Sequence, residues 1–168
     1  MRLSLRRIAA ASGIAVFALG SSATAAGADA PDFVLTLPAG VACAGFDLGI
    51  EGTYGTWHWR DFTDRNGEVI RTIGAGTGSA LTFRNLSTDA TVSFRSNGAV
   101  AQTTYADDGT MSVRMMGHNV LILFPTDNPP GPTSTLYIGQ VTFTVDADEV
   151  ATIQSTSGKE IDICAALS

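Results

Sequence analysis

The chain has 168 residues, of which 45% are hydrophobic and 15% charged, so it belongs to the ordinary globular class and one domain is expected. Its formal net charge at pH 7 is −6. A surface of this sign repels phosphate backbones and anionic lipids, which excludes general nucleic-acid binding and disfavours adhesion to an anionic membrane.

Residues 1–28 are expected to form a secretory signal peptide. Three arginines precede an apolar stretch, residues 8–19, that is too short to cross a bilayer as a helix but suits an h-region. Two triplets that end at Ala25 and Ala28 fit the A-x-A cleavage rule; an uncleaved membrane anchor is the alternative. Cleavage after Ala28 leaves residues 29–168 as a single secreted domain with a net charge of 7 − 16 = −9 and no membrane span.

The rest of the chain is expected to be all-β, because it alternates apolar and polar residues and shows no sustained helical period. We expect about ten short strands, which cover residues 46–50, 57–62, 69–73, 81–84, 91–95, 99–105, 111–116, 120–124, 137–145, 150–154 and 160–164.

Turn signals separate these strands. Asn66-Gly67 and Asp108-Gly109 supply the positive φ angles of tight hairpins, and residues 125–134, with four prolines, are expected to form a surface loop. Residues 120–124 are apolar on both faces and are expected to form a central strand buried on both sides. Strands at this spacing predict a single antiparallel β-barrel or β-sandwich, and periodicity does not choose between the two.

Cys43 and Cys164 are expected to form one disulfide that ties the first expected strand to the last, as an even cysteine count in an exported chain indicates. Free thiols with a redox or metal role are the alternative. Strand parity groups Cys164 with Asp162 and Cys43 with Asp47. The disulfide is therefore expected on the outer surface, between neighbouring strands.

Four segments carry a resemblance to a known group of proteins. They are residues 81–88 (LTFRNLST), 117–125 (GHNVLILFP), 136–143 (LYIGQVTF) and 161–167 (IDICAAL). Together with the early cysteine, they resemble small secreted actinobacterial proteins of unknown function, over roughly residues 43–168. The resemblance implies secretion and a single β domain, and it assigns no catalytic residue.

Signatures of catalysis are weak, so a non-catalytic protein is favoured over an enzyme. His58 and His118 are the two histidines, too few for a recognisable serine triad or zinc site, and each is expected to be structural. The acidic turn at residues 146–149 lacks the features of a calcium loop. We therefore expect no catalytic residue, no metal ligand and no cofactor; a small carboxylate-dependent enzyme is an alternative.

Two groups of residues are candidate ligand contacts. Trp57 and Trp59 share one face of an expected strand, and they either stack on a ligand or fill the core. The second group, Arg84, Arg95 and Arg114, is expected on the polar faces of consecutive hairpins, where it could hold a carboxylate or sulfate, or form salt bridges on an outer sheet.

The sequence thus predicts a secreted, non-catalytic β domain that binds an extracellular ligand: a small apolar molecule, a glycan or a protein. A structural or cell-surface-associated protein without a small ligand is the other alternative. The sequence predicts no oligomeric state.

Overall fold

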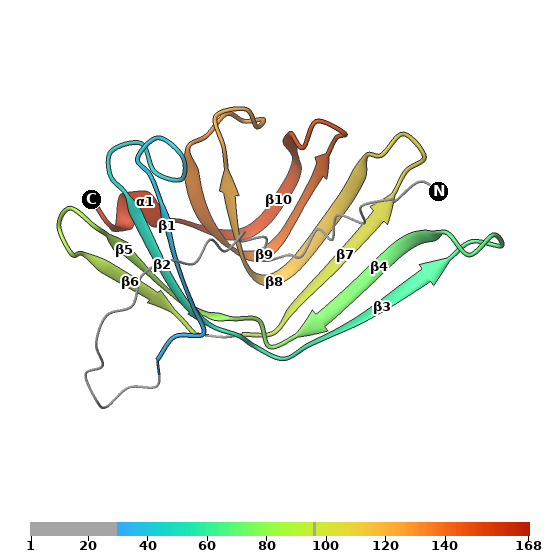
Figure 1. The fold of residues 1–168 in the computed structure, drawn as a ribbon, viewed down its shortest axis with the longest axis horizontal. Helices are drawn as coiled ribbons and strands as arrows, with labels where there is room; N and C mark the ends of the chain where they lie inside the picture. Colours follow the sequence, from blue (N-terminus) through green and yellow to red (C-terminus); the bar gives the residue numbers. More distant parts are fainter. Residues whose placement is uncertain (1–29, 96) are drawn as a thin grey trace, which may run out of the picture. The chain divides into compact units, whose positions relative to one another are not determined.

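A computed structural model describes residues 30–95 and 97–168, and a compact unit spans Pro31–Ser168. The expected signal peptide, residues 1–28, lies outside the described residues. The unit is all-β, with ten strands in two antiparallel sheets and one short helix, α1 (Ile163–Ala166) (Figure 1).

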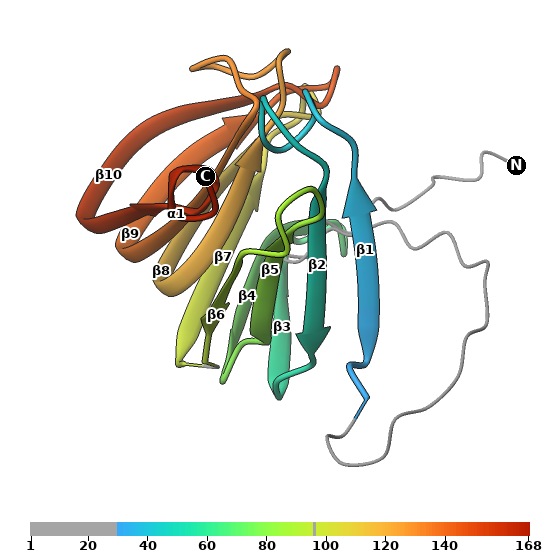
Figure 2. The same ribbon diagram turned by 90° about the vertical axis from the view of Figure 1, so that its left-hand side faces the viewer.

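The smaller sheet has four strands and the larger has six. In spatial order the smaller sheet contains β1 (Phe33–Leu37), β2 (Leu48–Thr53), β5 (Ala80–Asn85) and β6 (Thr91–Phe94). The larger sheet contains β10 (Ala151–Asp162), β9 (Thr133–Val145), β8 (Met111–Leu123), β7 (Ala99–Tyr105), β4 (Val69–Gly76) and β3 (Trp57–Thr63). Figure 2 shows the four strands of the smaller sheet side by side.

The chain passes between the two sheets three times, from β2 to β3, from β4 to β5 and from β6 to β7. The first two crossings are hydrogen-bonded to each other, since the Thr77 N–H donates to the Thr56 carbonyl at 3.0 Å and the Thr56 N–H donates to Thr77 Oγ1 at 2.9 Å. Beyond the crossings, β8, β9 and β10 run on as long strands that bend in the middle (Figure 1).

The bend follows a row of glycines, which we call the glycine line: Gly117 in β8, Gly139 in β9 and Gly158 in β10. They are Cα partners in register, and their φ angles are +93°, +144° and +97°. A Cβ at any of them would overlap a backbone carbonyl of the adjacent strand or crossing. Glycine is thus required here both for its positive φ and for the close approach of neighbouring backbones.

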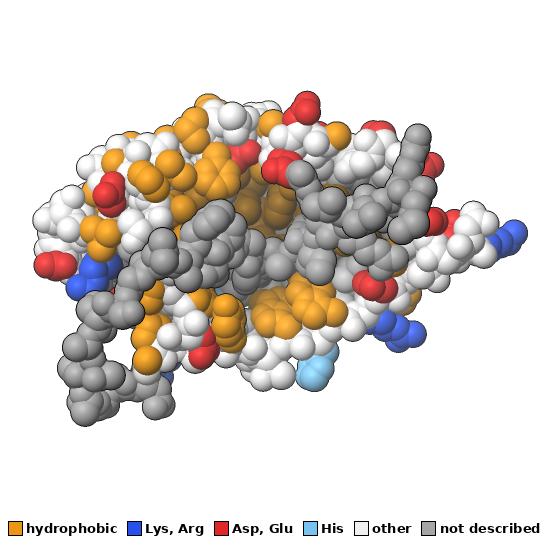
Figure 3. Space-filling view, in the orientation of Figure 1, with side chains coloured by type: hydrophobic (Ala, Val, Ile, Leu, Met, Phe, Trp, Pro, Cys, Tyr) orange, Lys and Arg blue, Asp and Glu red, His pale blue; other side chains and the backbone are white. Residues whose placement is uncertain are grey.

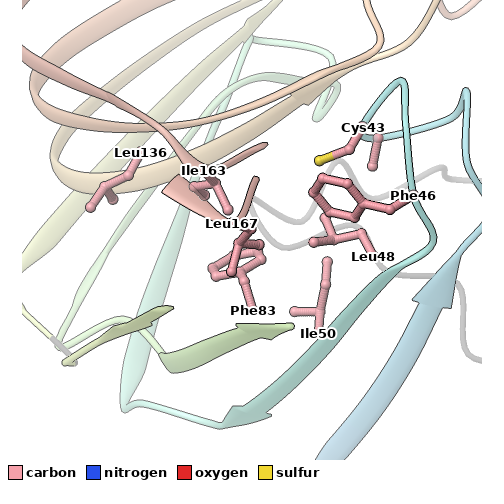
Figure 4. Close-up of a cluster of buried hydrophobic side chains, with 9 residues drawn as sticks. Cys43, Phe46, Leu48, Ile50, Phe83, Leu136, Ile163 and Leu167 are labelled. Atoms are coloured by element: carbon pink, nitrogen blue, oxygen red, sulfur yellow. The ribbon is translucent and has the colours of Figure 1, made fainter. Parts of the chain in front are cut away.

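The main core lies between the smaller sheet, β9 and α1 (Figure 4). Leu48 and Phe83 project from the smaller sheet, Leu136 comes from β9, and Ile163 and Leu167 come from the C-terminal segment; all are at most 3% exposed. Burial of each of these side chains contributes about 1.5–3 kcal/mol to stability. The core therefore joins the end of the chain to its first half.

The disulfide between Cys43 and Cys164 belongs to this core, which corrects the expected surface position. Cys43 is 0% exposed and Cys164 packs against the same cluster. Strand parity predicted the wrong face for the disulfide because neither cysteine lies in a strand. Cys43 precedes β2, and Cys164 lies in α1. Alternation predicts a face only within extended backbone.

Three further features differ from the expected elements. β1 was not expected, and β8 and β10 are each one strand where two were expected. The expected breaks fell next to Gly117 and near Gly158, because glycine inside a strand usually marks an interruption. Residues 120–123 form the second half of β8 and pair with β9 alone, because the pairing with β7 ends at Gly117. Leu123 is buried, but residues 120–122 are only partly buried and Phe124 is 43% exposed, so the expected central strand buried on both sides is wrong.

The side chain of Asp127 holds the proline-rich loop between β8 and β9 in place by hydrogen bonds, and it is only 5% exposed. The Phe124 N–H donates to its Oδ2 at 2.6 Å, and the Ala151 N–H donates to its Oδ1 at 2.8 Å. The carboxylate thus links this loop to the start of β10.

We expect Asp127→Ala to lower the free energy of unfolding by about 2–3 kcal/mol, because two backbone donors lose a charged acceptor. Urea denaturation measures the loss. Asp127→Asn keeps one carbonyl acceptor and should lose less, while Asp107→Ala, at an exposed turn, should change stability by no more than about 0.5 kcal/mol. A loss no larger than that of the Asp107 variant would contradict the role of Asp127.

Candidate functional site

Two stacked tryptophans mark the edge strand of the larger sheet. Trp57 and Trp59 lie two residues apart on β3, so both side chains point to one face. Their ring centroids are 5.3 Å apart and their planes differ by 15°. Trp57 is partly buried, whereas Trp59 is 48% exposed. The pair therefore presents an ordered aromatic surface to solvent.

A glycine of the adjacent strand β4 makes room for the Trp59 ring. Gly76 is the Cα partner of Trp57 and Gly74 is the partner of Trp59. A Cβ at Gly74 would overlap three atoms of the Trp59 ring, so the ring occupies the space that a side chain at Gly74 would fill. This cross-strand contact fixes the orientation of a ring that is half exposed.

The same face continues across the sheet as a row of buried apolar residues. The row that contains Trp59 and Gly74 runs on through Ala101, Met115 and Val141, which are 2%, 3% and 0% exposed. Figure 3 shows hydrophobic side chains along both sides of the hollow in this view. We call the face that carries this row the aromatic face, after its two tryptophans.

A polar group borders the tryptophans on this face. Asp61, two residues beyond Trp59, accepts a hydrogen bond at Oδ1 from the Thr72 hydroxyl at 2.7 Å. The Tyr105 hydroxyl in turn donates to Thr72 Oγ1 at 3.4 Å. The two hydroxyls hold an exposed carboxylate in place, and no hydrogen bond from another described residue reaches its second oxygen, Oδ2.

The opposite face of β3 and β4 carries the cations. Arg60 and Arg71 both lie over the Phe62 ring, with their guanidinium carbons 5.1 and 4.3 Å from the ring centroid. The stacking of Arg60 and Arg71 on Phe62 was not predicted from the sequence. Alternation along β3 could have grouped Arg60 with Phe62, but only the pairing of Phe62 with Arg71 brings the second arginine to the ring.

The structure does not bring the three predicted arginines together on one sheet. Arg84 is in β5 of the smaller sheet and forms an ion pair with Asp89 at 3.4 Å. Arg95 directly follows β6. Arg114 is in β8 of the larger sheet and donates from Nε and Nη2 to Gln140 Oε1 at 2.9 and 2.6 Å. Arg84 and Arg114 thus each have a local partner.

Among the described residues, no group of three or more His, Cys, Asp or Glu side chains could hold a metal ion. His118 Nδ1 lies 3.1 Å from Asn97 Nδ2, while His58 lies on exposed β3. No helix within residues 30–95 and 97–168 has the length and apolarity needed to cross a membrane.

One tyrosine of β9, Tyr137, has a shifted pKa. The pKa of Tyr137 is raised, first by desolvation and then by the negative charge of Glu160 on β10. Tyr137 is paired with Glu160 in register and is 7% exposed. A phenol with a raised pKa stays neutral at physiological pH, so it is a packed side chain rather than an activated one.

Comparison with known proteins gives no match: no family model, no curated protein and no solved structure matches the chain.

Proposed function

We propose that this protein is an exported, non-catalytic β domain that binds an extracellular ligand on its aromatic face. The observation that carries the proposal is Trp59, a large aromatic side chain that is 48% exposed and yet held by Trp57 and Gly74. An ordered, exposed indole is suited to binding, because little conformational entropy is lost when a ligand contacts it.

Export is part of the proposal. The leader-like pattern of residues 1–28 and a disulfide between Cys43 and Cys164 both support it, since disulfides persist in oxidising compartments. Relationship to the small secreted actinobacterial proteins is proposed with it. We also infer an open sandwich rather than a barrel, which the two separate sheets and the core between the smaller sheet and β9 support.

Tryptophan fluorescence offers a direct test, because Trp57 and Trp59 are the only tryptophans in the sequence. Selective excitation of tryptophan therefore reports on the aromatic face alone. Titration of the purified protein with extracellular polysaccharides and with a neutral apolar dye should change the emission for at least one of them. No change with any ligand would favour the alternative of a structural surface protein.

We expect Trp59→Ala to weaken ligand binding at least tenfold, which corresponds to about 1.4 kcal/mol, because a stacking surface is lost. The free energy of unfolding should fall by no more than about 1.5 kcal/mol, since half of the side chain is already exposed. Fluorescence titration and urea denaturation measure the two quantities.

Phe124→Ala is the matched control, because Phe124 is similarly exposed (43%) but directly follows β8, which β7 and β4 separate from β3. It should leave binding unchanged. If Trp59→Ala instead unfolds the domain, or costs the roughly 3–5 kcal/mol of a core aromatic, the tryptophan is a core residue and the proposal fails.

A further inference from the structure

We propose that the ligand of the aromatic face is a neutral polysaccharide, with a sugar ring stacked on Trp59 and a sugar hydroxyl donating to Asp61. This inference rests on the proposed function and names its ligand class. It follows from the groups that surround the exposed indole.

The first group is the indole itself. The ring of Trp59 occupies the space above Gly74 and stacks on Trp57, so its orientation is fixed while half of its surface stays open. The electron-rich face of an aromatic ring attracts the weakly positive C–H groups of a flat sugar face. Such stacking depends on apolar contact and shape alone. A hydrogen-bonding group next to the ring is needed to favour a sugar over another flat ligand.

Asp61 supplies that neighbour. Two residues along β3 place it about 7 Å from Trp59, on the same face. Its Oδ1 accepts the hydrogen bond of the Thr72 hydroxyl, which restrains the carboxylate, and Oδ2 is the oxygen that we assign to the ligand. A purely apolar ligand placed here would remove this charge from water without a partner, which is unfavourable. A sugar hydroxyl satisfies it.

The charge of the face selects neutral sugars over acidic ones. Arg60 and Arg71, the cations of β3 and β4, both stack on Phe62 on the opposite face. The aromatic face instead presents the Asp61 carboxylate, in a protein whose formal net charge is −6. Uronate or sulfate groups would be repelled, and no arginine or lysine of β3 or β4 shares the face to compensate them.

The position of β3 suits a polymer. It is the edge strand of the larger sheet, with only β4 as a neighbour in the described part of the chain. A polysaccharide chain can therefore extend past Trp59 on the side away from β4 without meeting another strand of that sheet. An enclosed small molecule would instead require residues on all sides.

Affinity electrophoresis tests the inference with the protein as it is secreted. The gels contain one neutral polymer each (hydroxyethylcellulose, xylan, galactomannan or soluble starch), and polygalacturonate serves as the acidic polymer. We expect retardation in at least one neutral gel and none in polygalacturonate. Retardation in no neutral gel, or stronger retardation in polygalacturonate, overturns the inference.

Three variants locate the binding. Trp59→Ala and Gly74→Ala should each abolish the retardation, the second because its methyl group displaces the Trp59 ring. Asp61→Asn keeps an oxygen for Thr72 but replaces the acceptor Oδ2 by an amide NH2 group, which cannot accept the sugar hydroxyl, so it should weaken binding tenfold or more. Phe124→Ala, just after β8, and Asp107→Asn, in the turn between β7 and β8, should bind as the unaltered protein does.

The outcomes separate this inference from the proposed function. If the tryptophan emission responds to the neutral apolar dye N-phenyl-1-naphthylamine and no neutral polymer retards the protein, ligand binding stands and the polysaccharide is wrong. If a neutral polymer retards the protein and Trp59→Ala does not matter, the proposed face is wrong as well. Retardation that is lost in Trp59→Ala but unchanged in Asp61→Asn overturns the role of the carboxylate.

Discussion

Replacing Cys43 and Cys164 together by alanine is expected to lower the free energy of unfolding by about 4–5 kcal/mol. The disulfide closes a loop with a sequence separation of 121 residues, and cross-linking so long a loop removes much entropy from the unfolded chain. Because a domain of this size has about 5–15 kcal/mol in total, the variant should be only marginally folded. Urea denaturation under oxidising conditions measures the change.

The site of the disulfide adds to this effect. Cys43 is fully buried beside Phe46, in the cluster that also contains the α1 residue Ile163, so its loss also loosens the contact between the first half of the chain and its end (Figure 4). Reducing the unaltered protein should reproduce the loss seen in the double variant. A double variant as stable as the oxidised protein would show that the core alone holds the two ends together.

Gly117→Ala is expected to have the second large effect, a loss of about 3 kcal/mol or more. The residue has a φ of +93°, and the added methyl group would overlap the carbonyl of Gly98 in the crossing before β7. The clash involves backbone on both sides, so neither strand can move aside without breaking the hydrogen bonds of β7 or β8. Urea denaturation compares the variant with the unaltered protein.

Gly67→Ala separates the two causes. Gly67 has a similar φ of +84°, but a Cβ there would meet nothing within 4 Å. This variant should lose only about 1–2 kcal/mol from the left-handed conformation. Equal losses in the two variants would mean that conformation alone matters and that close approach along the glycine line contributes nothing.

Most strands could be predicted from sequence, because each has its own local alternation. Val141 and Phe143 in β9 alternate with threonines, and the hairpin between β3 and β4 turns at Asn66-Gly67 where positive φ is needed. The carboxylate of Asp64 also fits this turn: it accepts the backbone N–H groups of Glu68 and Asn66, which lowers its pKa.

The candidate site was predictable only in part. Alternation placed Trp57 and Trp59 on one face, but their partners Gly74 and Gly76 depend on the register between β3 and β4. The hydrogen bond from Thr72 to Asp61 depends on the same register. Register is set by the hairpin and by long-range packing, and local patterns do not contain it.

What the sequence by itself determined is the all-β class, the hairpin turns and the pairing of the only two cysteines, because composition, local alternation and cysteine count are enough for these. Tertiary structure decided the rest. It placed Cys43 in the core, since neither cysteine is in a strand, and it made the glycines of β8 and β10 bends rather than breaks. It also put Arg84 and Arg114 in different sheets. In each case the deciding contact joins residues that are far apart in the chain, so no local pattern records it.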